Sequence, residues 1–156
     1  MRVALFQPDI PQNLGAALRL GACLGVPVDI IEPCGFPLSD AAVRRSAMDY
    51  AALAEVSRHA GWGDFQAAAR GQGRRLVLFT TRGASAFQDF AFAPDDVLLF
   101  GRESAGVPDE VHAVADARLF IPLAAGARSL NVVTAVAITL GEALRQTGGF
   151  PKAAPS

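Results

Sequence analysis

The residues with most scope for chemistry lie in two glycine-bearing loops in the last third of the sequence. The segments 97–108 (VLLFGRESAGVP) and 121–134 (IPLAAGARSLNVVT) each pass from a short apolar stretch into a loop. Glycine lets backbone N–H and C=O groups approach a ligand closely. A helix after the second loop, with Ser129 expected as its cap, offers free N–H donors and a partial positive charge. Together the loops predict a small-molecule pocket built mainly from backbone, although either alone would be an ordinary α/β turn.

Three polar side chains could act on a ligand in such a pocket. Glu103 lies in the first loop, and Asn13 and Arg19 stand near the start of a predicted helix. The planar fork of arginine suits contacts with phosphate. From chemistry alone a structural explanation is the simpler one, with Asn13 capping the helix and Arg19 solvated.

Apolar runs and the residues that break them predict the elements around these loops. Strands are expected over 2–6, 26–32, 54–59, 76–79, 97–100 and 119–122, and helices over about 13–25, 39–45, 65–71 and 129–146, with one more beginning at Pro108. Residues 84–94 are expected to form a packed connection. Because strands alternate with helices or crossovers, the fold class is α/β, with a mostly parallel sheet covered by helices on both faces. Ligands collect at the carboxyl ends of such strands, where Phe79 and Thr80 stand.

Length and composition favour a single domain over 1–150, with 151–156 as a flexible tail. The chain has 156 residues, 51% of them hydrophobic, and no apolar run near the roughly 20 residues that a membrane span requires. No export signal is visible at the N-terminus. Cys23 and Cys34 lack metal-ligand spacing, so we interpret them as reduced residues of a cytoplasmic protein without a metal site.

The basic residues are almost all of one type. Lys152 is the only lysine among 14 basic residues. The net charge of −1 argues against a strongly basic nucleic-acid binder. Adjacent Arg44 and Arg45 fit either the rim of an RNA site or a solvated helix face, and the preference for arginine fits a GC-rich genome equally well.

One glycine pair imitates a cofactor motif. Gly71-Gln-Gly73 follows a predicted helix and opens a strand, whereas a dinucleotide fingerprint follows a strand and opens a helix. The sequence also contains no G-x-x-x-x-G-K-[ST] segment. Nicotinamide-linked and P-loop chemistry are therefore not supported.

The helix expected at 129–146 is apolar nearly all round, through Leu130, Val132, Val133, Val136, Ile138, Leu140 and Leu144. A surface helix has one apolar stripe, so this one is expected to be buried on more than one side. The sheet covers only one of these sides. The pattern therefore predicts a second copy of the chain as a partner, forming a homodimer, with the Gly/Ala-rich helix expected over about 13–25 as a further candidate cover.

Several motifs in this order resemble those of the SpoU branch of the SPOUT RNA methyltransferases. They are the segments FGRESAGVP (100–108) and IPLAAGARSLNVVTA (121–135), the Asn-Gly-Arg pattern within 13–19, and Met48-Asp-Tyr50. The resemblance runs from Leu5 to about Gln146 and is strongest to short, single-domain members. It implies a C-terminal trefoil knot, a dimer, and methyl transfer from S-adenosylmethionine to a ribose 2′-hydroxyl of tRNA. The short members act on the wobble nucleotide 34 in the anticodon stem-loop, as cytidine or carboxymethylaminomethyluridine of leucine tRNAs.

The resemblance also implies roles for individual residues. Asn13, Arg19 and Glu103 are expected to be catalytic, positioning the substrate or handling its proton. The expected cofactor-binding residues are Phe79, Thr80, Gly101, Gly106, Ile121, Leu123 and Ser129. No metal is required, because a sulfonium already supplies a good leaving group and the protein has mainly to align the reacting atoms.

Two departures from the family pattern bear on substrate choice. Arg102 stands where relatives often have proline, and Gly141 stands where some have tyrosine. The alternatives left open are methylation of another tRNA or rRNA position and a non-catalytic RNA-binding protein of the same fold. A nicotinamide-linked enzyme is a third, which the missing fingerprint disfavours.

Overall fold

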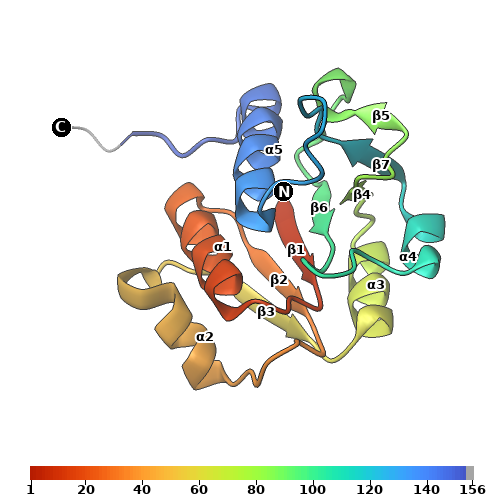
Figure 1. The fold of residues 1–156 in the computed structure, drawn as a ribbon. Helices are drawn as coiled ribbons and strands as arrows, with labels where there is room; N and C mark the ends of the chain where they lie inside the picture. The colour runs from red at the N-terminus through yellow and green to blue at the C-terminus, as the bar shows by residue number, and fades with distance from the viewer. Residues whose placement is uncertain (154–156) are drawn as a thin grey trace.

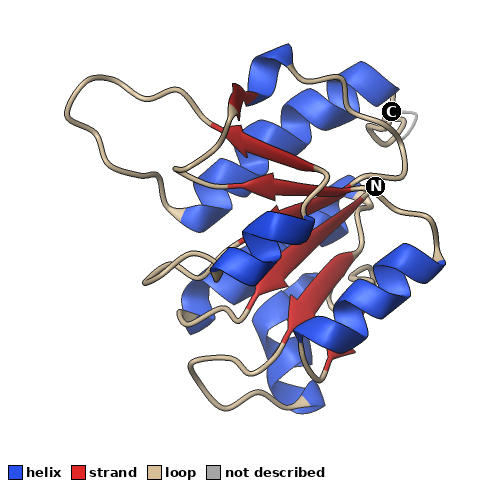
Figure 2. Ribbon diagram, turned by 90° about the vertical axis from the view of Figure 1, so that its right-hand side faces the viewer, coloured by secondary structure: helices blue, strands red, loops and turns tan. Residues whose placement is uncertain are grey.

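The computed structural model describes residues 1–153, which form one seven-stranded sheet with helices on both faces (Figures 1 and 2). All strand pairs are parallel and the order is β3-β2-β1-β6-β4-β7-β5. The strands are β1 Arg2–Phe6, β2 Val28–Ile31, β3 Val56–His59, β4 Leu76–Phe79, β5 Ser85–Ala86, β6 Val97–Phe100 and β7 Ala117–Phe120. The predicted α/β class is therefore confirmed. The end of the predicted tail, residues 154–156, lies outside the described residues.

Five helices cover the sheet in the described part of the chain. They are α1 Pro11–Leu24, α2 Asp40–Ala47, α3 Trp62–Gly71, α4 Asp109–Val114 and α5 Val132–Thr147, with short 3-10 turns η1 Met48–Tyr50 and η2 Phe87–Asp89. One apolar core joins α1, α2 and α5 to one face of the sheet, and a second core joins α3 and α4 to the other face. None of these helices is long and apolar enough to cross a membrane.

The central strands explain why the sheet forms and where a ligand would sit. All residues of β2, β4 and β6 are buried, as expected for parallel strands covered on both faces. Strand β6 lies between β1 and β4, where Phe100 pairs with Leu5 on one side and Phe79 on the other. Leu119 of β7 pairs with Phe79 in turn. The loops after these strands consequently meet at one edge of the sheet.

Two predicted helix caps are wrong, and each has a physical reason. Helix α1 begins at Pro11, because proline needs no N–H partner in a first turn, so Asn13 lies inside the helix and is free for other contacts. Helix α5 begins at Val132 with Asn131 as its cap, whose Oδ1 accepts hydrogen bonds from the backbone of Val133 (2.9 Å) and Thr134 (3.3 Å). Ser129 remains in the preceding loop.

The boundaries of the other helices and strands differ less from the predicted ones. Ser39 caps α2, as its position predicts, and accepts a bond from the Ala42 backbone at 3.1 Å. Strand β7 begins two residues before the predicted 119–122, at Ala117. The connection over 84–94 contains β5 and η2, which are too short to show a period in the sequence.

Helix α5 is buried along one side within the single chain. Its buried residues are Val136, Thr139, Leu140, Ala143 and Leu144. Ile138, on another side, is 42% exposed. Burial of α5 on more than one side thus stays a prediction, which concerns a dimer rather than the single chain.

Candidate functional site

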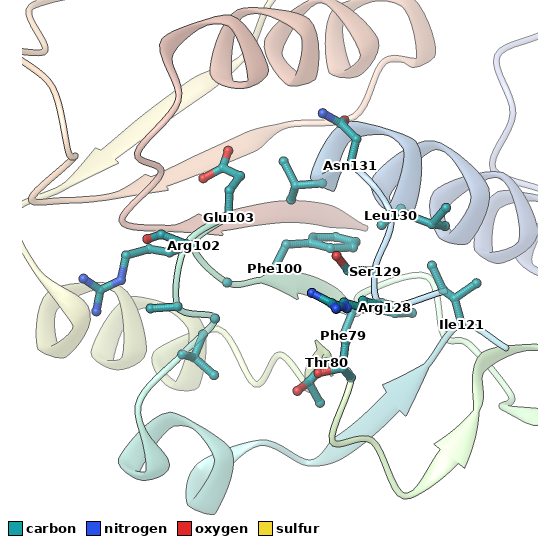
Figure 3. Close-up of a pocket in the computed structure, with 18 of the residues that line it drawn as sticks. Phe79, Thr80, Phe100, Arg102, Glu103, Ile121, Arg128, Ser129, Leu130 and Asn131 are labelled. Carbon is teal, nitrogen blue, oxygen red and sulfur yellow. The ribbon is translucent and has the colours of Figure 1, made fainter. Parts of the chain in front are cut away.

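An open cavity of about 740 Å³ lies at the carboxyl ends of β4, β6 and β7, where the two glycine-bearing loops face each other (Figure 3). All of the predicted site residues except Arg19 line it: Asn13, Phe79, Thr80, Gly101, Glu103, Gly106, Ile121, Leu123 and Ser129. They come from four separate parts of the chain. The fold thus brings together residues that are far apart in the sequence and that only the order of the motifs relates to one another.

The first wall is a tight loop that requires its two glycines. The backbones of Arg102 and Gly106 exchange two hydrogen bonds, at 3.0 and 2.9 Å. Gly106 has a φ of 64°, which L side chains rarely adopt. A Cβ on Gly101 would lie only 2.6 Å from the carbonyl carbon of Gly106. At these two positions the backbone therefore faces the cavity without an intervening side chain.

Aromatic rings from two adjacent strands supply the apolar part of the cavity. The rings of Phe79 and Phe100 stack with centroids 4.9 Å apart and planes inclined by 6°. Phe79 is buried, and Thr80 follows it on the rim, with its N–H bonded to the Leu119 carbonyl at 2.9 Å. This pair of stacked rings suits a flat, partly apolar group of a ligand.

The second wall is the segment 121–131, which leads into α5. Leu123 and Leu130 are both partly exposed there, at 36% and 37%. Sequence reasoning missed Arg128 and Asn131 on this wall. Asn131 had a visible signal, since asparagine before an apolar helix is a preferred cap, whereas nothing about Arg128 distinguishes it from other arginines in the sequence.

A chain of hydrogen bonds runs along one side of the cavity and joins three loops. Asn131 Nδ2 donates to Asn13 Oδ1 (3.1 Å), and Asn13 Nδ2 donates to Glu103 Oε1 (3.1 Å). The Asp9 backbone N–H donates to Glu103 Oε2 (3.2 Å), and Ser104 Oγ donates to Asp9 Oδ2. Asp9, which sequence reasoning missed, belongs to this chain although it lies just behind the cavity lining.

The two carboxyls in that chain influence each other. Burial, and after it the Asp9 carboxyl, raises the pKa of Glu103 above its ordinary value. Hydrogen bonds involving Glu103 and then Ser104 lower the pKa of Asp9. The carboxyls are thus unequal, with Glu103 the more readily protonated member.

Arg19 lies apart from the cavity of its own chain. It is exposed on α1, with its guanidinium carbon 4.9 Å from the centre of the Tyr50 ring. It stands six positions after Asn13 along the helix, a rise of about 9 Å. Its catalytic role stays a prediction, and one that a single copy of the described chain does not place beside the other site residues.

The potential metal ligands and the two cysteines of the described part of the chain lie apart from one another. No group of three or more His, Cys, Asp or Glu side chains within residues 1–153 is arranged to hold a metal ion. Cys23 and Cys34 are both free. Burial, together with the nearby Glu32 charge, raises the pKa of Cys34 to about 11 and keeps it a thiol.

Comparison with known proteins agrees with the sheet, the cavity and the motifs. Residues 1–141 match the model of the SpoU rRNA Methylase family, and the chain belongs to that family. It is 58% identical over 152 residues to a tRNA (cytidine(34)-2′-O)-methyltransferase of Ancylobacter novellus, covering 97% of this chain and 96% of that protein. The resemblance drawn from the motifs is confirmed.

Solved structures of RNA methyltransferases share the fold of this chain. A structure from work on the 2-OH methylation of C/U34 on tRNA superposes with a TM-score of 0.86 at 39% identity, covering 93% of this chain and 94% of the other. An AdoMet-bound rRNA methyltransferase from Sinorhizobium meliloti superposes with a TM-score of 0.81 at 32% identity, covering 92% of this chain and 55% of that one.

Proposed function

We propose that this protein transfers a methyl group from S-adenosylmethionine to the ribose 2′-hydroxyl of nucleotide 34 of a tRNA. The observation that carries the proposal is the cavity between two glycine-bearing loops, bordered by the Asn131–Asn13–Glu103 hydrogen-bond chain. Membership of the SpoU family and the named activity of the Ancylobacter novellus relative support it.

The residues present fit the cofactor. The cavity of about 740 Å³ is within the usual range of roughly 300–1,000 Å³ for small-molecule sites. The stacked Phe79 and Phe100 suit a purine, and the backbone around Gly101, Gly106 and Ile121 can exchange hydrogen bonds with it. The AdoMet-bound Sinorhizobium meliloti structure, of the same fold, supports this assignment. Leu123, Thr80 and Ser129 complete the proposed cofactor set.

Catalysis then consists mainly of alignment. When bound, S-adenosylmethionine supplies a methyl group on a good leaving group, and a ribose hydroxyl is a weak nucleophile. The chain has to orient that hydroxyl and ease the loss of its proton. Asn13 and Glu103 border the cavity with polar groups that are already hydrogen-bonded and therefore oriented. No step in this scheme uses a metal.

Three of the arginines that lack an ion pair within the described chain suggest where tRNA binds. Arg19, Arg44 and Arg45 have no carboxylate partner there and are exposed on α1 and α2. The two helices approach closely, since a Cβ on Gly15 would lie 3.2 Å from the Ser46 carbonyl oxygen. We infer that this surface contacts phosphates of the anticodon stem-loop.

Two features of the assembly belong to the same proposal. Exposed Ile138 on α5 favours a homodimer. Arg19 lies too far from the cavity of its own chain to act there, so in the dimer it would act in the cavity of the second copy.

The segment 121–131 leads from β7 back to α5, which packs beside α1 and over β6 (Figure 1). That path supports a C-terminal trefoil knot within one domain over 1–150. A cytoplasmic location, with free thiols, completes the proposal.

Methylation of tRNA transcripts with purified protein tests the reaction. We expect methyl transfer to a tRNA with cytidine 34 and none to the same tRNA with 2′-deoxycytidine at that position. Calorimetry should show S-adenosylmethionine binding that survives a chelator. Equal methylation of the two tRNAs would move the target to another tRNA or rRNA position, and no methylation despite cofactor binding would favour a non-catalytic RNA-binding protein.

The dimer has its own test. Ile138→Asp places a charge on the exposed apolar side of α5 and should lower both the dimer fraction in light scattering and the methylation rate. A fully active monomer at assay concentration would contradict the dimer.

A further inference from the structure

Asp9 is held in one position at the end of β1, immediately beside Glu103. Its backbone N–H donates to Glu103 Oε2 at 3.2 Å, and its Oδ2 accepts a hydrogen bond from Ser104. These contacts join residues more than 90 positions apart, at the adjoining ends of two paired strands. The chain therefore fixes the backbone and one carboxyl oxygen of Asp9 against the loop that carries Glu103.

A glycine in a third loop fits closely against Asp9. A Cβ on Gly35 would lie 2.6 Å from the Cβ and 2.9 Å from the Cα of Asp9, too close for any other residue type without a shift. The Gly35 N–H also donates to the Pro8 carbonyl at 2.9 Å. Asp9 is thus packed against Gly35 as well as bonded to the loop that carries Glu103, which limits the freedom of its carboxyl to move.

The remaining oxygen of Asp9 lacks a partner. Oδ1 is buried and has no hydrogen-bond partner among the described residues. A buried carboxylate oxygen without a donor is costly. Glu103 is the neighbouring group that can supply one, because a protonated carboxyl becomes a donor while its oxygens still accept bonds. Both Glu103 oxygens already accept, from Asn13 and from the Asp9 backbone.

We propose that Asp9 is a positioning residue for Glu103: its carboxylate accepts a hydrogen bond from a protonated Glu103 and holds that carboxyl against Asn13 at the cavity edge. Burial raises the pKa of Glu103, and its bond with Asp9 raises it further, in the direction that this arrangement needs. The role in methyl transfer rests on the proposed function, whereas the shared proton does not depend on it.

The charges around the pair agree with a single negative charge. Neither carboxyl forms an ion pair with a cation within residues 1–153. Titratable groups near the pair include Cys34, from the β2–α2 loop, on which the Glu103 charge acts, and Arg102, next in sequence to Glu103. The Cys34 thiol is neutral, and the Arg102 guanidinium lies over the Phe6 ring, 5.7 Å from its centre. One shared proton removes one of two charges beside a cavity that an RNA backbone has to approach.

Carbon-13 NMR of glutamate carboxyls tests the shared proton without any assay of activity. The Glu103 resonance is assigned by its loss in Glu103→Gln. In the unmodified protein it should titrate above the ordinary glutamate value of about 4.3. In Asp9→Asn it should titrate at least about one pH unit lower, because the amide can donate to an ionised Glu103. The exposed Asp89→Asn is the matched control and should change nothing.

Turnover supplies the second readout. Asp9→Asn should slow single-turnover methylation roughly 10- to 100-fold, the scale for a displaced reacting group, with S-adenosylmethionine affinity within about twofold. Gly35→Ala, which displaces Asp9 without removing its charge, should slow it in the same direction. A Glu103 that titrates at its ordinary value, or identically in Asp9→Asn, overturns the proposal. If the unmodified protein methylates no RNA, the proposed function fails while the titration still decides the shared proton.

Discussion

Replacing Gly101 by alanine would place a methyl group 2.6 Å from the carbonyl carbon of Gly106 and 2.7 Å from its Cα. Ordinary van der Waals contact begins near 3.4 Å, so the facing backbone would have to move by about 0.8 Å. That backbone is tied to Arg102 by two hydrogen bonds and cannot rotate out of the way as a side chain would. Overpacking of this kind costs about 1–3 kcal/mol, which for a chain of this length lowers Tm by roughly 2–12 °C.

The larger effect is expected on the cofactor. The displaced segment forms a wall of the cavity, so Gly101→Ala should raise the S-adenosylmethionine Kd by about tenfold or more, equivalent to about 1.4 kcal/mol. Calorimetry measures the affinity, and thermal unfolding followed by circular dichroism measures the stability. Gly63→Ala is the matched control, because an added Cβ there meets no atom within 4 Å and alanine favours helix α3. Unchanged affinity and Tm in Gly101→Ala would refute the close approach of the two glycines.

Three further changes probe other parts of the molecule. Arg19→Ala should lower the methylation rate by about 100-fold with Tm nearly unchanged. Arg19→Lys should not restore the full rate, because the point charge of lysine does not replace the planar fork of arginine. An unchanged methylation rate in Arg19→Ala would make Arg19 an ordinary surface residue. Iodoacetamide at pH 8 should label exposed Cys23 well before Cys34, whose pKa of about 11 leaves little thiolate, and mass spectrometry showing equal labelling would contradict this. Ser39→Ala removes the cap of α2 and should cost about 1 kcal/mol, or roughly 2–4 °C in Tm by calorimetric scanning; no change would show that Ser39 contributes nothing.

Strands β1, β4 and β6 were predictable from the sequence because each is an almost continuous apolar run. Strand β3 contains Ser57, Arg58 and His59, and β5 has only two residues, so neither shows such a run. Parallel strands covered on both faces need apolar residues at every position, and such runs are visible without any knowledge of neighbours. The order of the strands was not predictable in the same way. Strand β6 inserts between β1 and β4, far from its neighbours in the chain, and nothing local to 97–100 specifies that position.

The candidate site, too, was predictable from the sequence only in part. Its glycine loops were found because glycine is informative by itself and because the motifs resemble a family. Asp9 was missed because its partners, Glu103 and Ser104, lie more than 90 residues away, and an isolated aspartate after a proline has no distinguishing pattern. The cap at Asn13 was wrong because Pro11 starts α1 two residues earlier, with Ile10 at the cap position and no side-chain cap bond. The cap at Ser129 was wrong because Asn131, two residues later, is an equally acceptable cap and is the one that α5 uses.

The net charge of −1 does not conflict with an RNA substrate, because pairing cancels much of the charge locally. Arg2 and Arg75 are bound to buried Asp29 and Asp96, so these four charges contribute little field at the surface. Arg44 and Arg45 keep theirs, since neither has a carboxylate partner in the described chain. A polyanion approaching α2 therefore meets unpaired positive charge, although the sum over the sequence is negative. The distribution of ion pairs, rather than the total charge, decides where a nucleic acid can bind.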